Sequence, residues 1–147
     1  MAIFPWCFER EVSFTKEQAL PIIFNIHEGN FAADNLPFLL RDAGLSCRVI
    51  KSNNLFTVVF DDGHKSFITK DIDNSSITIQ GEWWFKVTYS FTQKEGKTIL
   101  KATIFNVAKR TNWAASLMNF YNKDKFRSDF YQLADKLEKE ISLQENS

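Results

Sequence analysis

The clearest pattern in the sequence is an alternation of apolar and polar residues that begins at Trp83 and continues to Thr92. A period of two predicts a strand with one buried and one exposed face. Lys94-Glu95-Gly96 then predicts a turn, after which apolar residues return at alternate positions. The pattern therefore predicts a long β-hairpin whose inner face carries Trp83, Phe85, Val87, Tyr89, Phe91, Leu100, Ala102 and Ile104.

A second long pattern follows, in which apolar residues from Thr111 to Leu143 recur with the period of an amphipathic helix. About thirty helical residues would form a rod about 45 Å long, because each residue adds about 1.5 Å. Such a rod can bury one face only against a curved surface, and the upstream strands are the candidate. We therefore predict an α+β helix-grip fold, in which a curved antiparallel sheet of about six to seven strands wraps a long C-terminal helix.

The C-terminal helical pattern contains two apolar stripes, which lie about half a turn out of phase at about 100° per residue. The first stripe consists of Trp113, Leu117, Phe120 and Tyr121, and the second of Phe126, Phe130, Leu133, Leu137 and Ile141. One straight helix cannot bury both stripes against one surface. The first stripe is therefore expected either to form a short helix that gates a cavity or to pack on the N-terminal helices.

The N-terminal region predicts one strand followed by two short helices. Apolar residues alternate from Trp6 to Phe14, and Arg10 is in phase with them, so its side chain must be paired, meet a ligand or turn to solvent at a bulge. Thr15-Lys-Glu-Gln18 has the form of a capping box and predicts a helix from Lys16 to Ile26, with a kink or later start caused by Pro21.

The segment from Asn35 to Gly44 predicts the second short helix, with Asn35 as its N-cap. Segments of period two, separated by turn residues, then predict four strands that begin near Leu45, Leu55, His64 and Ser76.

Length and charge restrict the classes of protein that remain. A chain of 147 residues is expected to form a single domain, residues 1–147. The 18 basic and 18 acidic residues balance, which argues against a nucleic-acid binder because such proteins need a basic excess. Cys7 and Cys47 lack metal or redox spacing, the N-terminus does not resemble a signal peptide, and no apolar run is long enough for a membrane span. We expect a soluble cytoplasmic protein with reduced thiols.

The sequence carries no motif for a catalytic centre, a metal or a cofactor. Neither His27 nor His64 has a second histidine or a cysteine at ligand spacing, so no metal site is predicted. Glycine-rich phosphate-binding loops are also missing, and no cofactor is predicted. A binding role is therefore favoured over an enzymatic one, and no catalytic residue is assigned.

The order of the predicted elements resembles the START-like superfamily, which includes plant pathogenesis-related allergens, START lipid-transfer domains and bacterial polyketide cyclase/dehydrase-type proteins. The resemblance is strongest in the last hairpin and helix. The residues that carry it are Tyr89-Ser-Phe-Thr, Gly96, Leu100-Lys-Ala-Thr-Ile-Phe, Asn112-Trp-Ala-Ala-Ser-Leu-Met, Phe126, Phe130, Leu133 and Leu137-Glu-Lys.

The resemblance implies a cavity between the sheet and the C-terminal helix that binds or transports a hydrophobic or amphipathic small molecule, including a lipid. The residues expected to contact the ligand are Arg10, Phe85, Val87, Tyr89, Phe91, Leu100, Ala102, Ile104, Trp113, Leu117 and Tyr121. One alternative is an aromatic cyclase in which Arg10 and Tyr89 orient the substrate. Another is a protein-interaction domain that uses the stripe from Trp113 to Tyr121. The expected partner is a small molecule, and the expected state is a monomer or weak homodimer.

Overall fold

The protein is described here by a computed structural model, which covers residues 5–82, 85–106 and 123–145 and all of their side chains except those of Phe85 and Asn106. Its helices are α1 (Lys16–Ile23), the 3-10 helix η1 (Phe38–Ala43) and α3 (Lys123–Glu145). Its strands are β1 (Trp6–Val12), β2 (Gly29–Phe31), β3 (Cys47–Ser52), β4 (Leu55–Phe60), β5 (Lys65–Asp71), β6 (Ser76–Gly81), β7 (Phe85–Lys94) and β8 (Lys97–Asn106).

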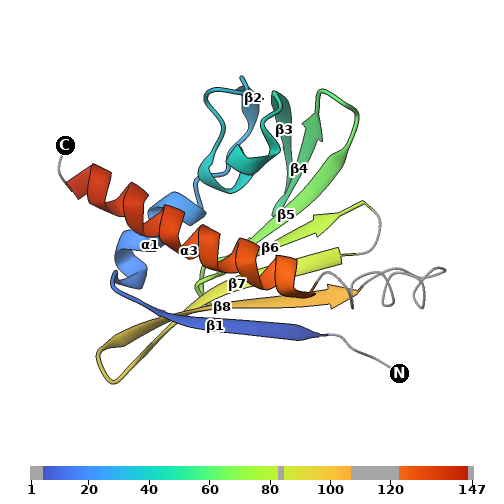
Figure 1. Cartoon of the computed structure of the whole chain (residues 1–147). Helices are drawn as coiled ribbons and strands as arrows, with labels where there is room; N and C mark the ends of the chain where they lie inside the picture. Colours follow the sequence, from blue (N-terminus) through green and yellow to red (C-terminus); the bar gives the residue numbers. More distant parts are fainter. Residues whose placement is uncertain (1–4, 83–84, 107–122, 146–147) are drawn as a thin grey trace.

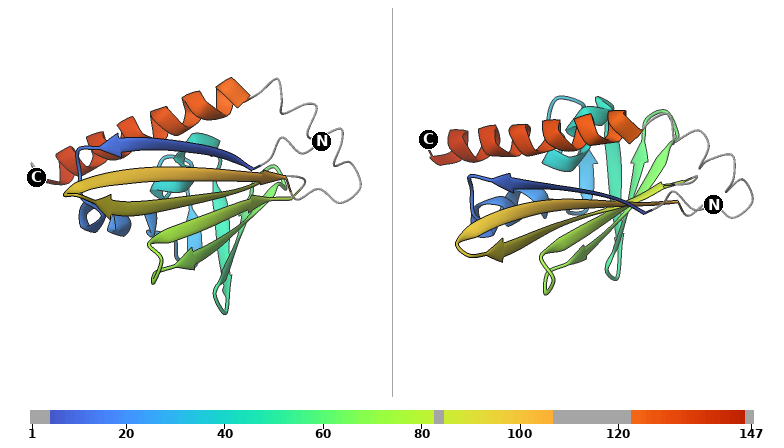
Figure 2. Two further views of the ribbon diagram at one scale, coloured as in Figure 1. Left: turned by 90° about the horizontal axis from the view of Figure 1, so that it is seen from below. Right: turned by 60° about the horizontal axis from the view of Figure 1, so that its bottom comes forward.

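The strands form one antiparallel sheet in the order β1-β8-β7-β6-β5-β4-β3-β2. The sheet twists strongly, and α3 runs across one of its faces beside β1, while α1 lies under the C-terminal half of α3 (Figures 1 and 2). The α+β prediction of an antiparallel sheet with a long C-terminal helix packed on it is confirmed. The sheet has more strands than predicted, because β2 spans three residues and is too short to show a periodic pattern.

Helix α1 begins where the capping box predicts. The Gln18 amide donates to the Thr15 hydroxyl at 3.2 Å, and the Thr15 amide donates to the Gln18 side chain at 2.8 Å. The prediction of an extension to Ile26 is wrong, since the helix ends at Ile23, two residues after Pro21. Proline has no amide hydrogen to donate within the helix, which favours an early end.

The second short helix also differs from the prediction, because it is a 3-10 helix that starts at Phe38. Its N-cap position is occupied by Pro37 rather than Asn35, and no side chain caps it. The predicted end of this helix at Gly44 is confirmed, because Gly44 is its C-cap and adopts φ = +65°, a left-handed conformation that glycine accepts without strain.

Paired residues of neighbouring strands form rows on the sheet face that α3 covers. One row passes through Trp6, Ile104, Val87, Ile79, Ile68 and Phe56, and the next through Phe8, Ala102, Tyr89, Ile77 and Lys70. Most of these side chains are buried, and Ile68 and Ile77 have no exposed surface. The inner face predicted for the last hairpin is therefore the face that packs on the helix.

Helix α3 buries one stripe against these rows. Its buried residues are Phe130, Ala134, Leu137 and Ile141. The Phe130 ring stacks on Phe8 with a centroid distance of 6.1 Å, and the Phe126 ring lies 5.7 Å from Trp6. The second predicted apolar stripe thus faces the sheet, whereas the first stripe, from Trp113 to Tyr121, lies outside the described residues.

Cys7 and Cys47 are free thiols, of which Cys7 is exposed and Cys47 is buried. Burial, helped by the negative charge of Asp61, raises the pKa of the Cys47 thiol. Within the described part of the chain, no helix combines the length and apolar character needed to cross a membrane.

Candidate ligand-binding site

A cavity of about 140 Å³ lies between the sheet and the first turns of α3. Its lining residues are Val87, Tyr89, Ala102 and Ile104 from the hairpin and Phe126, Asp129 and Phe130 from the helix. The walls are therefore mainly apolar, with the Tyr89 hydroxyl and the Asp129 carboxylate as the side-chain polar groups. This arrangement is typical of small-molecule sites, in which a few polar groups orient a ligand among apolar walls.

The strand register explains why space remains at this position. Tyr89 pairs with Ala102, which in turn pairs with Phe8, so a single methyl group stands between two aromatic residues on the inner face. Val87 and Ile104 pair in the neighbouring row. Because protein interiors are otherwise tightly packed, a small residue between large neighbours leaves a gap that the helix above does not fill.

Tyr89 supplies the hydroxyl group of the lining. Among the described residues it has no hydrogen-bond partner. Burial raises the pKa of Tyr89 to about 12, with smaller contributions from the negative charges of Asp129 and Asp42. The phenol therefore stays neutral at ordinary pH and is able to donate or accept a hydrogen bond.

Asp129 lies at the rim of the cavity, where its side chain is about half exposed. Its Oδ2 atom accepts a hydrogen bond from Lys125 Nζ at 3.0 Å, an i to i+4 pair along the helix. The Lys125 side chain is mostly exposed and is not part of the lining. Asp129 thus brings a negative charge to the cavity while its cationic partner remains in solvent.

Arg10 does not contribute to the cavity lining. Its Nη2 atom lies 2.8 Å from Asp135 Oδ1, its Nη1 donates to the Tyr131 carbonyl oxygen at 3.1 Å, and its guanidinium lies over the Tyr131 ring. Of the three possibilities left open for Arg10, the structure therefore shows the first: its side chain is paired, and its partners are on α3.

The remaining residues assigned to the site from the sequence fall into three groups. Val87, Tyr89, Ala102 and Ile104 line the cavity. Phe91 and Leu100 are buried in the next cross-strand row, where Phe91 meets the Phe14 ring edge-on at 6.4 Å, and they do not line it. Phe85 lies in β7, but its side chain, together with Trp113, Leu117 and Tyr121, lies outside what the structure describes.

The helix contributes three lining residues that the sequence analysis did not assign to the site. Phe126, Asp129 and Phe130 occupy positions i, i+3 and i+4 of α3 and hence share one face. Phe126 and Phe130 were assigned to the apolar stripe that packs on the sheet. For Asp129 the sequence did contain a signal. An acidic residue that shares a helix face with two phenylalanines is expected at the edge of the buried surface, where a polar group can border a cavity.

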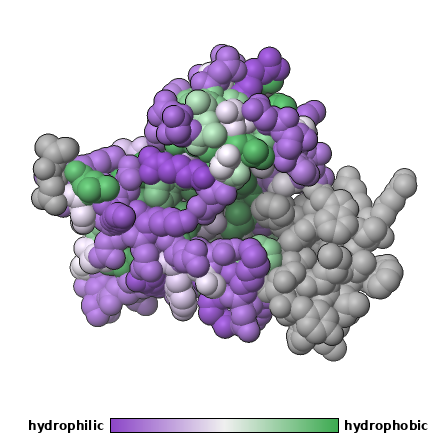
Figure 3. Space-filling view, turned by 45° about the horizontal axis from the view of Figure 1, so that its top comes forward, coloured by the Kyte–Doolittle hydropathy of each residue, from purple (hydrophilic) through white to green (hydrophobic). Residues whose placement is uncertain are grey.

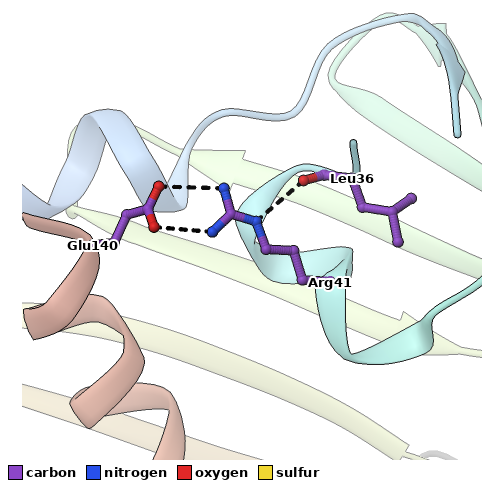
Figure 4. A network of polar contacts seen from close by, with 3 residues as sticks. All are labelled: Leu36, Arg41 and Glu140. Carbon is purple, nitrogen blue, oxygen red and sulfur yellow. Dashed lines mark hydrogen bonds and ion pairs between the residues drawn. The ribbon is translucent and has the colours of Figure 1, made fainter. Parts of the chain in front are cut away.

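A second groove, of about 280 Å³, separates η1 from the C-terminal half of α3. Ion pairs bridge it: Arg41 binds both carboxylate oxygens of Glu140 at 3.0 and 3.3 Å, and Lys136 lies 2.7 Å from Asp42. Arg41 also donates to the carbonyl oxygen of Leu36 at 3.3 Å (Figure 4). In Figure 3, apolar surface is visible between the polar side chains of this region. These bridges join η1 to the helix and engage four of the five charged residues of the groove, all except Lys139.

A wider depression, of about 630 Å³, lies along β2, β3 and β4. It is broadly open to solvent and has a mixed lining that includes Asn30, Ser46, Arg48 and Asp61. An open surface of this kind does not remove a small apolar molecule from water, so it is a weaker candidate than the cavity under α3.

Neither histidine belongs to a group of potential metal ligands. His27 packs edge-on against Phe31, and His64 pairs with Asp62 at 2.8 Å, which raises the pKa of His64. Within the described ranges, no cluster of three or more histidine, cysteine, aspartate or glutamate residues is arranged to hold a metal ion.

Comparisons with known proteins support the fold. No protein-family model matches the sequence, and no curated protein matches it. The structure of XoxI from Bacillus cereus is similar, with a TM-score of 0.55 and 13% identity over 97% of this chain and 99% of that chain. TTHA0849 from Thermus thermophilus has a TM-score of 0.56 and 11% identity, over 96% and 99% of the two chains.

An uncharacterized protein from Bacillus thuringiensis has a TM-score of 0.52 and 11% identity, over 89% of this chain and 96% of that chain. These identities, between 11 and 13%, are too low to transfer an activity. The similarity extends over nearly the whole chain, and it supports a helix-grip-like arrangement of the sheet and the C-terminal helix.

Proposed function

We propose that this protein is a START-like protein that binds a small hydrophobic or amphipathic molecule between its sheet and its C-terminal helix. The observation that carries the proposal is the cavity of about 140 Å³ under α3, with apolar walls and a tyrosine hydroxyl that no described residue engages. Such a hydroxyl supplies orientation, and the apolar walls supply most of the binding free energy.

The volume limits the size of the ligand. An apolar cavity of about 150 Å³ in a protein core holds one benzene molecule. The described cavity therefore fits a single six-membered ring with a small polar substituent, or the ring-sized end of a longer molecule. Burying about 100 Å² of apolar surface from such a ring contributes about 2–3 kcal/mol, so binding of a ring alone is expected in the millimolar range.

Ligand-observed NMR with benzyl alcohol tests the proposal. Saturation transfer from the protein to the ring protons is expected in the wild type. Ala102→Leu adds three carbons at the point where the strand register leaves the gap, and it should abolish the transfer. Thr103→Leu is the matched control, because Thr103 is the next residue of β8 and faces the other side of the sheet.

Overpacking is the main risk for the Ala102 variant, since added carbons in a packed core cost about 1–3 kcal/mol. Val87→Ile adds one carbon to the same lining and should weaken the transfer in a chain that stays folded by circular dichroism. Equal saturation transfer in the wild type and in both folded cavity variants would overturn the proposal, as would its absence from the wild type.

The alternative of an aromatic cyclase requires Arg10 and Tyr89 to face one substrate, but only Tyr89 lines the cavity. Arg10 is paired with Asp135 and lies outside the lining, so it does not face a substrate together with Tyr89. The protein-interaction alternative depends on Trp113, Leu117 and Tyr121, which lie outside the described residues. No contact or surface of the described residues supports it. The binding role is therefore the function that the described residues favour.

A further inference from the structure

We infer that the cavity under α3 selects neutral or cationic amphiphiles whose polar group donates a hydrogen bond, and that it discriminates against carboxylates. This inference rests on the proposed binding function and adds the class of ligand. The inference follows from two observations. Tyr89 and Asp129 are the polar side chains of the described lining, and nearby cationic side chains are already paired with carboxylates.

The polar groups of the lining come from opposite sides of the cavity. Tyr89 stands on β7 of the sheet, and Asp129 stands on the helix above it. The other lining side chains are apolar. A ligand with one polar end would therefore place that end near Tyr89 and Asp129, because no other described side chain of the lining offers it a hydrogen bond.

The Tyr89 hydroxyl can donate or accept a hydrogen bond, whereas the Asp129 carboxylate can only accept one. The Asp129 carboxylate has no proton to donate, and its Oδ1 atom forms none of the hydrogen bonds of the described residues. A hydroxyl or ammonium group on the ligand matches this pair, since it donates to Asp129 and also bonds to the Tyr89 hydroxyl. A carboxylate matches Tyr89 alone and places a second negative charge beside Asp129.

Three described cations of β1 and of the first turns of α3 are already paired. Lys125 pairs with Asp129 itself, Arg127 pairs with Asp124 at 2.9 Å and lies over the Phe8 ring, and Arg10 pairs with Asp135. Asp129 is the charged member of the described lining. Within the described lining an anionic ligand would therefore lose its hydration without meeting a positive charge, and burial of an unpaired charge is strongly unfavourable.

The environment of the Tyr89 side chain disfavours negative charge. Its anionic form is disfavoured, chiefly by burial and then by the charges of Asp129 and Asp42, which is why its pKa is raised. The same physical conditions apply to any anion placed beside it.

Three ring-matched probes test the inference: benzylamine, benzyl alcohol and benzoate, each titrated at pH 7 by NMR. We expect benzylamine to bind about fivefold more tightly than benzoate, which is the upper end of the effect that a partly exposed charge pair produces. Benzyl alcohol should lie between them. Asp129→Asn should reduce the ratio of benzylamine to benzoate affinity to less than about twofold.

Glu138→Gln is the matched control, because it removes one negative charge from the same helix at an exposed residue that lies outside the lining and contacts the Ser13 hydroxyl rather than one of these cations, and it should leave the ratio unchanged. Benzoate affinity equal to benzylamine affinity, with benzyl alcohol binding still abolished by Ala102→Leu, would overturn the charge selectivity and leave the proposed function in place. No cavity-dependent binding of any of the three probes would overturn both.

Discussion

The guanidinium of Arg10, on the edge strand β1, lies 2.8 Å from the carboxylate of Asp135, on α3. The same guanidinium donates to the carbonyl oxygen of Tyr131 one helical turn earlier. A charged side chain that points from a sheet towards a packed helix must be neutralised, and here the helix itself supplies the partners. Arg10 therefore joins the edge of the sheet to the helix that covers it.

Replacing Arg10 should reduce stability without affecting ligand binding. Arg10→Ala removes a partly exposed ion pair, a hydrogen bond and a cation–π contact, and a loss of about 1–2.5 kcal/mol in the free energy of unfolding is expected. Asp135→Asn, whose side chain is mostly exposed, should cost less than about 1 kcal/mol. Urea unfolding measures both. An Arg10→Ala protein of unchanged stability that no longer binds benzyl alcohol would assign Arg10 to the ligand.

Leucines at two positions of α3 should differ sharply in their contribution to stability. Leu137 has no exposed surface, whereas Leu143 is 58% exposed. Leu137→Ala should lower the free energy of unfolding by about 2–5 kcal/mol, because it leaves a cavity in the core. Leu143→Ala should change it by less than about 0.5 kcal/mol. Similar losses in the two variants would show that Leu143 is packed in the core as Leu137 is, contrary to its exposure in the structure.

Neighbouring residues of β7 should respond in opposite ways to a negative charge. Phe91 is buried on the inner face, and Thr92 is exposed on the outer face. Phe91→Asp should unfold the protein, because an unpaired carboxylate would replace a buried ring. Thr92→Asp should stay folded and lose about 1 kcal/mol at most. Thermal unfolding followed by circular dichroism distinguishes them, and the reverse order would mean that the strand is one residue out of register.

The hairpin and the terminal helix were predictable because their periodic patterns are long. The alternation from Phe85 to Thr92 extends over several strand periods, so the buried face follows directly from the sequence. The same holds for the stripe from Phe126 to Ile141, whose buried members face the sheet. Capping by Thr15 and Gln18 was also readable, since it depends on residues three positions apart.

Features that depend on contacts between distant residues were not predictable. Strand β2 has three residues and exists because β3 offers it a partner. The sequence of α3 places Asp129 at the edge of the buried stripe, but Asp129 lines a cavity only because α3 is held over Tyr89 and Ala102. The partners of Arg10 do not follow from the sequence for the same reason, because they lie more than 120 residues away.

The raised pKa of Tyr89 predicts that stability decreases at alkaline pH in a way that Tyr89→Phe removes. The pKa is about 12 in the folded protein and about 10 in an unfolded chain. Between these values the unfolded chain releases the phenolic proton while the folded protein keeps it, so the free energy of unfolding falls as the pH rises from about 10 to about 12.

Urea unfolding of the wild type and of Tyr89→Phe at pH 8, 9, 10 and 11 measures this contribution. The difference between the two proteins should be constant up to about pH 9 and should then shift in favour of the variant, with a limit of about 2–3 kcal/mol because each pKa unit corresponds to about 1.4 kcal/mol. Other groups that titrate in this range are present in both proteins and cancel in the difference. Parallel curves up to pH 11 would mean that the phenol titrates normally, and that burial under α3 does not raise the pKa of Tyr89.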